Sequence, residues 1–439
     1  MATIKASYFI DKFNSSAFAK NVAMIAGGTA AAQAISMAFA PVITRLYGPE
    51  AFGVMGTFVA IAAVVTPVAA LTYPIAIILP KNDADALGLA RLSLLIAAGI
   101  TLFMGLLILV FQGQIIELLN LQTITSFILL IPLFMLFSAC LQVAQQWLIR
   151  KKEFGITARV NVATTFIENS AKAVFGLINP VAAMLVVIAT LGGALKAGLL
   201  VLGARKAPQI NGENVPSHVT PLRELAKRHW DFPFLRAPQE FINAVSLSLP
   251  VLLLASFFGP AAAGFYSIGK RVLSLPSSLI ARSVGTVFYP RITEAAHRGE
   301  NLTRLIMKAT LALGTIGVAP FGLAVLFGPW LFGFVFGAEW VIAGEYARWI
   351  ALWSFFAFIN RPSMAAIPVL SLQGFLLGYE VVSIIMRVAA LGVGFYIFSS
   401  DIYAVAIYSL VSVLLNFCLV YVTIYAAKNI DLKNGLVKV

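Results

Sequence analysis

The sequence predicts an all-α polytopic membrane protein. We expect twelve transmembrane helices in two six-helix lobes, related by a pseudo-two-fold axis along the membrane normal, with a central cleft. Of the 439 residues, 60% are hydrophobic and only 11% are charged, whereas ordinary globular domains carry about a quarter charged residues. Uncharged runs of about 20 residues recur along the chain, each long enough to cross ~30 Å of hydrocarbon. A motif repeated in the two halves is the third observation.

The first apolar run follows three lysines, as it would in a secretory signal peptide. It extends over residues 21–43, which is longer than the apolar region of about 7–15 residues in a signal peptide. We therefore interpret it as a retained first helix. The twelve expected spans are 21–43, 51–79, 86–111, 121–149, 157–178, 181–203, 233–258, 262–289, 304–328, 344–370, 374–399 and 402–426.

Basic residues gather in alternate connections between these spans, while the opposite connections hold only Arg45. Because Lys and Arg favour the cytoplasmic side, both termini are predicted to be cytoplasmic. The asymmetry accounts for much of the net charge of +13, since cytoplasmic flanks face anionic headgroups, and no nucleic-acid partner is expected. The basic connections contain Lys5, Lys12, Lys20, Lys81, Arg150, Lys151, Lys152, Arg205, Lys206, Arg223, Lys227, Arg228, Arg291, Arg298, Lys428, Lys433 and Lys438.

The longest polar stretch between spans divides the chain into two halves. The expected organisation is a cytoplasmic N-terminal segment (1–20), an N-lobe (21–203), a cytoplasmic linker (204–232), a C-lobe (233–426) and a cytoplasmic tail (427–439). Every outer connection is short, so no outer domain is predicted that could hold a catalytic site. We therefore expect a protein that is not an enzyme.

Cysteine and histidine residues give no sign of a metal or cofactor site. Cys140 and Cys418 both lie inside apolar runs, so neither a disulfide framework nor a metal cluster is predicted. The three histidines lie in or beside polar loops without the spacing of metal ligands.

The two halves repeat a short motif, Gly-Pro-x-x-x-Gly. It opens the second span at residues 48–53 and the eighth at residues 259–264, an offset of 211. The same spans close on Leu79-Pro80 and Tyr289-Pro290. Because each half has an even number of spans, the two copies share one orientation. A molecule of two such bundles has a cleft that can open to either side, which is the architecture of a transporter.

Charged residues lie inside several spans, where each needs a partner or an aqueous surface. Arg236, Glu240 and Asn243 share one face of the seventh span. Lys270 and Arg271 are adjacent, deep and of like sign, and their own helix has no acidic residue. Only an anion or a distant carboxylate can neutralise them, and we expect an anion to bind Lys270 and Arg271, together with Arg236.

Other charges leave two interpretations open. Two acid–base sets are either structural ion pairs or parts of a site: Glu168 with Lys172, and Glu380 with Arg387. Three further basic residues either extend to the membrane surface or line water: Arg159, Lys196 and Arg282. Thr29, Gln33 and Ser36 form a milder polar stripe. Basic residues outnumber acidic ones in the spans, which favours an anionic cargo, with phosphate or pyrophosphate the best match for Arg. The basic set is Lys172, Lys196, Arg236, Lys270, Arg271, Arg282, Arg348, Arg361 and Arg387, against Glu168, Glu240 and Glu380.

Prolines interrupt several spans, and each frees a carbonyl group and favours a bend. Such bends serve either as structural accommodation or as hinges for alternating access. The prolines concerned are Pro67, Pro74, Pro238, Pro250, Pro276, Pro362 and Pro368.

Four stretches resemble the polysaccharide biosynthesis flippases of the Wzx (O-antigen) type, within the multidrug/oligosaccharidyl-lipid/polysaccharide exporter superfamily. They are Thr-Arg-Leu-Tyr-Gly-Pro-Glu-Ala-Phe-Gly at 44–53, residues 73–86, Gln-Trp-Leu-Ile-Arg-Lys-Lys-Glu-Phe-Gly at 146–155, and Gly-Phe-Tyr-Ser at 264–267. Many relatives carry an acidic residue where this chain has Pro74, so a role of that acidic position does not carry over.

The resemblance implies that the chain flips an undecaprenyl-pyrophosphate-linked oligosaccharide, an O-antigen or related repeat unit, from the inner to the outer leaflet of a bacterial inner membrane by alternating access. In such relatives the first two spans of each lobe wall the cleft. We accordingly expect pyrophosphate on Arg236, Lys270 and Arg271, with Arg361 as a further cation. Gln33 and Asn243 are expected to contact sugars.

Glu240 and Glu168 are the candidate coupling carboxylates. No cofactor is expected; the coupling agent is a proton, sodium or the membrane potential. The expected partners are the lipid-linked oligosaccharide, membrane lipids, and a polysaccharide polymerase with its chain-length regulator.

Four alternatives compete with this interpretation. A cation-coupled drug antiporter of the same superfamily would favour a carboxylate-rich cavity, and a membrane enzyme would need a sizeable outer loop. An assembly protein without transport activity leaves the basic residues unexplained. A peptidoglycan lipid-precursor flippase is nearer in kind but usually has two further spans.

Overall fold

The computed structural model describes residues 17–119, 122–206 and 220–433, and over these residues the chain is helical, without strands. The predicted all-α class is confirmed, and a helix lies in each of the twelve expected spans. Among the described residues, eight helices are long and apolar enough to cross a membrane. The larger helices are α2 (Ala17–Ala69), α4 (Asp83–Leu119), α5 (Leu130–Arg150), α6 (Phe154–Ile178), α7 (Ala182–Lys206), α9 (Ala237–Phe258), α10 (Pro260–His297), α11 (Leu302–Phe336), α12 (Val341–Ile359), α14 (Gln373–Tyr396) and α15 (Asp401–Lys433).

Short helical elements join these helices. They are α3 (Tyr73–Ala76), η1 (Gln122–Phe127), α8 (Leu222–Arg228), the π-helical η2 (Phe232–Arg236), η3 (Ala338–Trp340) and α13 (Arg361–Ala366). Residues 1–16, 120–121, 207–219 and 434–439 lie outside the described residues, as do the side chains of Pro276 and Arg282.

The chain forms two compact units. Unit 1 comprises Met1–Tyr47 and Val54–Ser248, and unit 2 comprises Gly48–Gly53 and Leu249–Val439. The long helix α2 therefore contributes to both. At Gly48 its backbone leaves the helical region, with φ 66° and ψ 170°, a conformation that glycine adopts without steric cost.

In unit 1, α5 packs against both α4 and α7. Its core includes the fully buried Phe58 and Met135, with Phe134 edge-to-face against Phe58. The hydroxyl groups of Thr66, Thr101 and Thr190 each donate to the carbonyl four residues earlier. Such bonds satisfy polar side chains that face hydrocarbon or protein rather than water.

The helix of the expected span 51–79 ends earlier than predicted, at Ala69. Leu71 and Thr72 have positive φ, and α3 then begins with Pro74 in its first turn. A proline cannot continue the preceding helix because it lacks the N–H donor. The Thr72 hydroxyl donates to the Phe232 carbonyl over 3.0 Å, which fixes the break.

The other prolines do not all interrupt a helix. Pro250 lies inside continuous α9, and Pro362 lies in the first turn of α13, directly after the break at Asn360 that splits the expected span 344–370. The expected span 121–149 begins as the 3₁₀ helix η1, and α5 starts only at Leu130.

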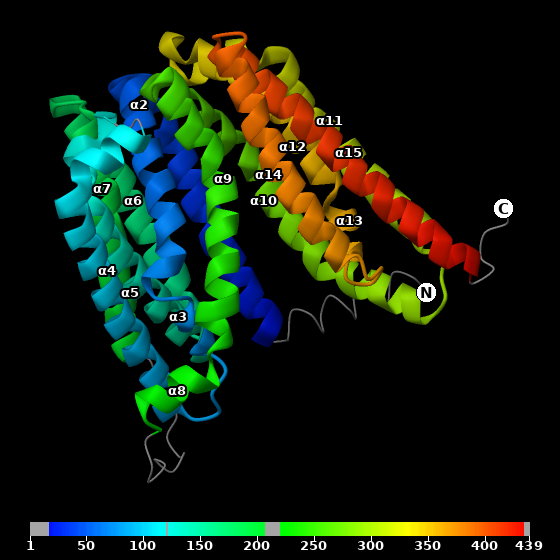
Figure 1. The fold of residues 1–439 in the computed structure, drawn as a ribbon, viewed down its shortest axis with the longest axis horizontal. Helices are drawn as coiled ribbons and strands as arrows, with labels where there is room; N and C mark the ends of the chain where they lie inside the picture. Colours follow the sequence, from blue (N-terminus) through cyan, green and yellow to red (C-terminus); the bar gives the residue numbers. More distant parts are fainter. Residues whose placement is uncertain (1–16, 120–121, 207–219, 434–439) are drawn as a thin grey trace. The chain divides into compact units, whose positions relative to one another are not determined.

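Unit 2 is built on α12, which packs against α10, α11 and α15. α14 and α15 lie side by side (Figure 1). Trp340 is almost fully buried, and the rings of Phe52 and Phe265 meet it edge-to-face at 5.2 and 6.1 Å. Residues 48–53 therefore pack as an integral part of this unit.

The last helix, α15, continues to Lys433, beyond the predicted end of the span at 426. Asp431 is fully buried, and its carboxylate accepts hydrogen bonds from the backbone N–H groups of Leu302 and Thr303, at 3.0 and 2.9 Å. These donors are among those that the first turn of a helix leaves unpaired. The end of α15 thus caps the start of α11.

Candidate functional site

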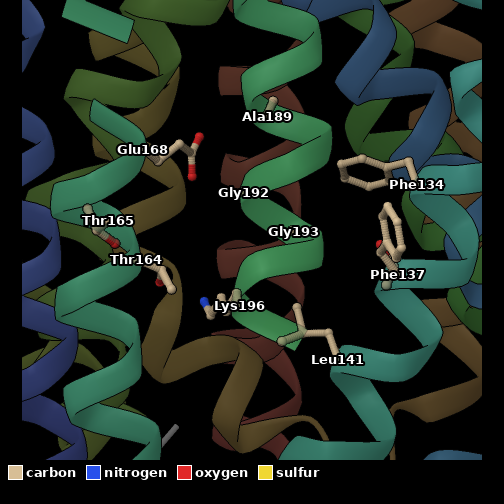
Figure 2. A pocket seen from close by; sticks show the side chains of 11 residues that line it. Phe134, Phe137, Leu141, Thr164, Thr165, Glu168, Ala189, Gly192, Gly193 and Lys196 are labelled. Carbon is tan, nitrogen blue, oxygen red and sulfur yellow. The ribbon is translucent and has the colours of Figure 1, made fainter. Parts of the chain in front are cut away.

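Unit 1 contains a cavity of about 170 Å³ between α5, α6 and α7 (Figure 2). Gly192 and Gly193 leave the backbone of α7 uncovered on its floor. Phe134 and Phe137 of α5 stand on one side and Glu168 of α6 on the other. The lining residues are Phe134, Phe137, Ser138, Leu141, Thr164, Thr165, Glu168, Ala189, Gly192, Gly193 and Lys196.

Glu168 supplies the acidic group of the cavity. Its carboxylate accepts a hydrogen bond from Lys172 Nζ at 2.5 Å, and its side chain is 31% exposed. The predicted ion pair is therefore confirmed. A Cβ at residue 192 would stand 3.0 Å from Glu168 Oε2, so glycine is needed there for the carboxylate to lie against α7.

Lys196 supplies the basic group. Its ammonium donates to Asn161 Oδ1 at 2.5 Å, so it joins α7 to α6 rather than snorkelling away from the protein. Glu168, Lys196 and the hydroxyl groups of Thr164 and Thr165 thus face one small space between apolar rings. Such a site can hydrogen-bond a polyhydroxylated group and pack against its apolar face.

The polar stripe of the first span contacts α6 through Ser36. The Asn169 amide reaches the Ser36 hydroxyl at 3.5 Å, and the Tyr47 hydroxyl donates to the Lys172 carbonyl at 2.9 Å. Gln33 is half-buried and has no side-chain hydrogen bond within the described residues. The structure therefore brings Ser36, rather than Gln33, to the Glu168–Lys172 region.

Arg236 lies at the end of η2, just before Pro238. Its guanidinium pairs with Glu240 at 3.2 Å, and the side chains are 49% and 37% exposed. Asn243 is exposed on the same helix. The expected common face is present, but the charge of Arg236 is partly balanced by Glu240.

In unit 2, Lys270 and Arg271 point in different directions. Lys270 is half-buried, with Nζ 5.9 Å from the centre of the Tyr266 ring, whereas Arg271 is exposed. Adjacent residues of a helix project about 100° apart. The two cations therefore do not form a single fork, and Lys270 is the one directed into the protein.

Comparison with known proteins identifies the family. A family model described as polysaccharide biosynthesis protein matches residues 42–345, more than half of the chain. The chain belongs to the polysaccharide biosynthesis protein family. One relative, the succinoglycan biosynthesis transport protein ExoT of Rhizobium meliloti (strain 1021), is 22% identical over 324 residues, which cover 71% of this chain and 61% of that protein.

The chain also resembles solved structures of membrane transporters. The lipid II flippase MurJ in its inward closed conformation has a TM-score of 0.68 at 14% identity, covering 94% of this chain and 90% of that one. A multidrug resistance MATE family transporter in its inward-facing conformation has a TM-score of 0.67 at 13% identity, with coverage of 93% and 96%. This family member therefore shares the two-lobe transporter fold and is a multi-pass membrane protein.

Residues 73–86 and 146–155, two of the stretches that resemble the flippase family, contact each other in this family member. Arg150 Nε donates to Asp83 Oδ1 at 2.9 Å, and Arg150 Nη1 donates to the Pro80 carbonyl at 2.6 Å. Lys151 also bonds to Asp83. The contact fixes the end of α5 to the start of α4, so these residues have a structural role.

Two arginines of this family member have no ion pair among the described residues. Of the two interpretations left open for Glu380 and Arg387, the ion pair does not form among the described residues, and within them Arg387 Nε is buried without a hydrogen-bond partner. Arg361 is exposed at the start of α13 and makes no ion pair among the described side chains.

Proposed function

We propose that this family member exports an anionic, lipid-linked oligosaccharide, an undecaprenyl-pyrophosphate-linked saccharide repeat unit, from the inner to the outer leaflet of a bacterial inner membrane. Alternating access of two helical lobes would carry the polar part across while the lipid tail stays in the bilayer. The family and the succinoglycan transport protein relative support a saccharide cargo.

One observation carries the anionic part of the proposal. Glu168, Glu240 and Glu345 each form an ion pair with a basic residue on the same helix. Arg361 and Arg387 then remain without an ion pair among the described residues, and so does the exposed carboxylate of Glu380, which leaves the cations in excess. An excess of positive charge in membrane helices attracts an anion, whereas a carrier of cationic drugs would favour free carboxylates.

Within this proposal, Lys270 and Arg271 contact the pyrophosphate, with Arg361 and Arg236 as further cations. Gln33 and Asn243 contact sugars. Glu168 is the stronger candidate for coupling to protons or sodium because it lines a cavity with Lys196; Glu240 is the second. Outward passage of each negative charge is favoured by about 2.3 kcal/mol per 100 mV of inside-negative potential.

Reconstituted vesicles test the proposal. The full-length protein is placed in vesicles that contain a polyprenyl-pyrophosphate oligosaccharide, and the fraction open to an external glycosidase is measured over time. We expect the protein to accelerate exposure, and Lys270→Gln to reduce that rate. Arg304→Gln, at the start of α11, is the matched control and should leave it unchanged.

Two results would overturn the proposal. The first is vesicles in which the protein moves a cationic drug but not the lipid. The second is a preference for the peptidoglycan lipid precursor over the polyprenyl-pyrophosphate oligosaccharide, which would assign the chain to the alternative class of flippase. In cells, loss of the gene should cause the oligosaccharide lipid to accumulate on the inner leaflet. Cross-linking to a polymerase or chain-length regulator tests the proposed partners separately.

A further inference from the structure

Three helices of unit 2 each present two polar side chains one turn apart. α14 and α15 pack directly against each other (Figure 1). The Tyr266 ring meets the Tyr408 ring edge-to-face at 6.4 Å, which joins α10 to α15. The polar pairs are Tyr266 and Lys270 on α10, Ser383 and Arg387 on α14, and Tyr408 and Ser412 on α15.

The two cations of this cluster lie at the same depth. Lys270 comes ten residues after Pro260 and Arg387 comes nine residues before Tyr396, so each lies about 14–15 Å from its helix end. Since α10 and α14 run in opposite directions, these ends are on the same side. Both charges therefore sit near the middle of a hydrocarbon layer of ~30 Å.

Arg387 and Lys270 are close enough to influence each other. The charge of Arg387 acts on the Lys270 ammonium and on the hydroxyl groups of Tyr266 and Tyr408. The exposed Glu380 acts on Tyr379 but forms no ion pair with Arg387 among the described residues. Two like charges at this depth repel each other and favour a bound anion.

Several polar groups beside the two cations could still donate hydrogen bonds. Arg387 Nε and Ser409 Oγ are buried without a hydrogen-bond partner among the described residues, while the buried hydroxyl groups of Tyr266, Ser383 and Ser412 have only neighbouring tyrosine hydroxyl groups beside them. The Tyr408 hydroxyl lies beside those of Tyr266 and Ser412. Buried donors left unpaired cost free energy, and an unfilled ligand site is one explanation for such a cluster.

We infer that Arg387 and Lys270, with the hydroxyl groups of Tyr266 and Tyr408, form a binding site for a phosphate-bearing anion inside unit 2. A guanidinium fork, an ammonium and several O–H donors complement the oxygen atoms of a phosphate or diphosphate. The physiological ligand rests on the proposed function, under which it is the pyrophosphate of the lipid-linked saccharide. Arg387 then joins Lys270 as a phosphate ligand, a role that the sequence had given to Arg236 and Arg271.

Binding is tested on the purified full-length protein in detergent, with inorganic pyrophosphate as the probe. We expect pyrophosphate to raise the unfolding temperature saturably, and Arg387→Gln and Lys270→Gln each to weaken the affinity by roughly tenfold or more. Arg304→Gln should bind like the wild type. Arg387→Lys keeps the charge but loses the fork, and should retain part of the affinity.

The unliganded variants separate binding from structural support. Because Arg387→Gln removes a repulsion, the unliganded variant should unfold at the wild-type temperature or above it. A lower unfolding temperature together with unchanged pyrophosphate affinity would mean that Arg387 is a structural residue, and overturns the site. Should Arg387→Gln not fold, Tyr408→Phe removes a single hydroxyl and should still weaken pyrophosphate binding.

A second arm distinguishes a lipid headgroup from free phosphate. Nanodiscs of phosphatidylcholine are prepared alone, with phosphatidylglycerol, or with a polyprenyl pyrophosphate, and the unfolding temperature is compared. Stabilisation by the polyprenyl pyrophosphate that depends on Arg387 supports the site. Equal stabilisation by phosphatidylglycerol, without any by pyrophosphate, overturns the diphosphate assignment. If the protein binds pyrophosphate through Arg387 but moves no lipid-linked saccharide, the binding site is supported and the proposed function is overturned.

Discussion

Gly53 lies directly against the backbone carbonyl of Pro260, so closely that a Cβ at residue 53 would overlap the Pro260 oxygen. The reciprocal contact also exists, since a Cβ at Gly264 would overlap the carbonyl of Pro49. The two Gly-Pro-x-x-x-Gly motifs, found 211 residues apart in the sequence, therefore meet within unit 2 through each other's proline carbonyl and final glycine.

Alanine at either glycine should separate these helices. We expect Gly53→Ala and Gly264→Ala each to destabilise the protein by about 1–3 kcal/mol, the usual cost of overpacking. Gly322→Ala on α11 is the control, since no atom lies within 4 Å of the position a Cβ would take; it should be neutral or slightly stabilising. Thermal unfolding in detergent is the measurement. Equal stability of the three variants would show that the contact is not close-packed.

Features set within one helix could be predicted from the sequence. Glu168 and Lys172 are four residues apart, the spacing at which helical side chains meet, and they form the expected pair. The lengths of the uncharged runs also predicted where the helices lie, because a membrane span needs about 20 apolar residues. The repeat offset likewise identified the two motifs that meet at Gly53 and Gly264.

Contacts between helices could not be predicted in this way. Lys196 bonds to Asn161 across two helices, and Asp431 caps a helix that begins 129 residues earlier. Arg387 lies near Tyr408 and Lys270 of two other helices, and it forms no ion pair with Glu380 of its own helix among the described residues. Such partners depend on the rotation and register of neighbouring helices, which hydropathy and single-helix spacing do not fix.

Breaking the Glu168–Lys172 pair should leave a buried ammonium without its partner. Removal of one member of a buried pair is costly, and since Glu168 is 31% exposed we expect Glu168→Gln to cost about 1–3 kcal/mol. The double variant Glu168→Gln/Lys172→Gln should recover part of that loss because no unpaired charge remains. Unfolding temperatures of the single and double variants check this; strictly additive losses would argue against a direct interaction.

A matched surface pair serves as the control for that experiment. Glu224 and Arg228 are also four residues apart, but their side chains are 59% and 54% exposed. Exposed pairs contribute little because water screens them. Glu224→Gln should therefore leave the unfolding temperature essentially unchanged.

The carboxylate of Asp431 should be important for the start of α11. It accepts the backbone N–H groups of Leu302 and Thr303 and the Thr303 hydroxyl, the last at 2.6 Å. Hydrogen bonds to a charged group contribute about 1.5–3 kcal/mol, so Asp431→Ala should cost about 2–3 kcal/mol. Asn301→Ala removes only the local bond to the Arg304 N–H and should cost about 1 kcal/mol. Hydrogen exchange at Leu302 and Thr303 should rise most in Asp431→Ala; unchanged exchange there would contradict the cap.

His229 should make the stability of unit 1 depend on pH. Burial is the largest cause that lowers the pKa of His229, aided by Arg228 and opposed by Asp231 and Asp85; the ring also packs against Phe232. A histidine in the unfolded chain titrates near pH 6.5, so as the pH falls through that value the unfolded state binds the proton first. Stability is therefore full above that pH and declines below it.

Thermal unfolding at about pH 8 and about pH 5.5 brackets that titration. The wild type should lose more stability at the lower pH than His229→Gln, in which the group is absent. His297→Gln is the control, since His297 is exposed at the end of α10, and it should retain the wild-type dependence. If His229→Gln loses as much stability as the wild type on acidification, the pH dependence comes from other groups, and the packing of His229 against Phe232 would not be what disfavours its protonation.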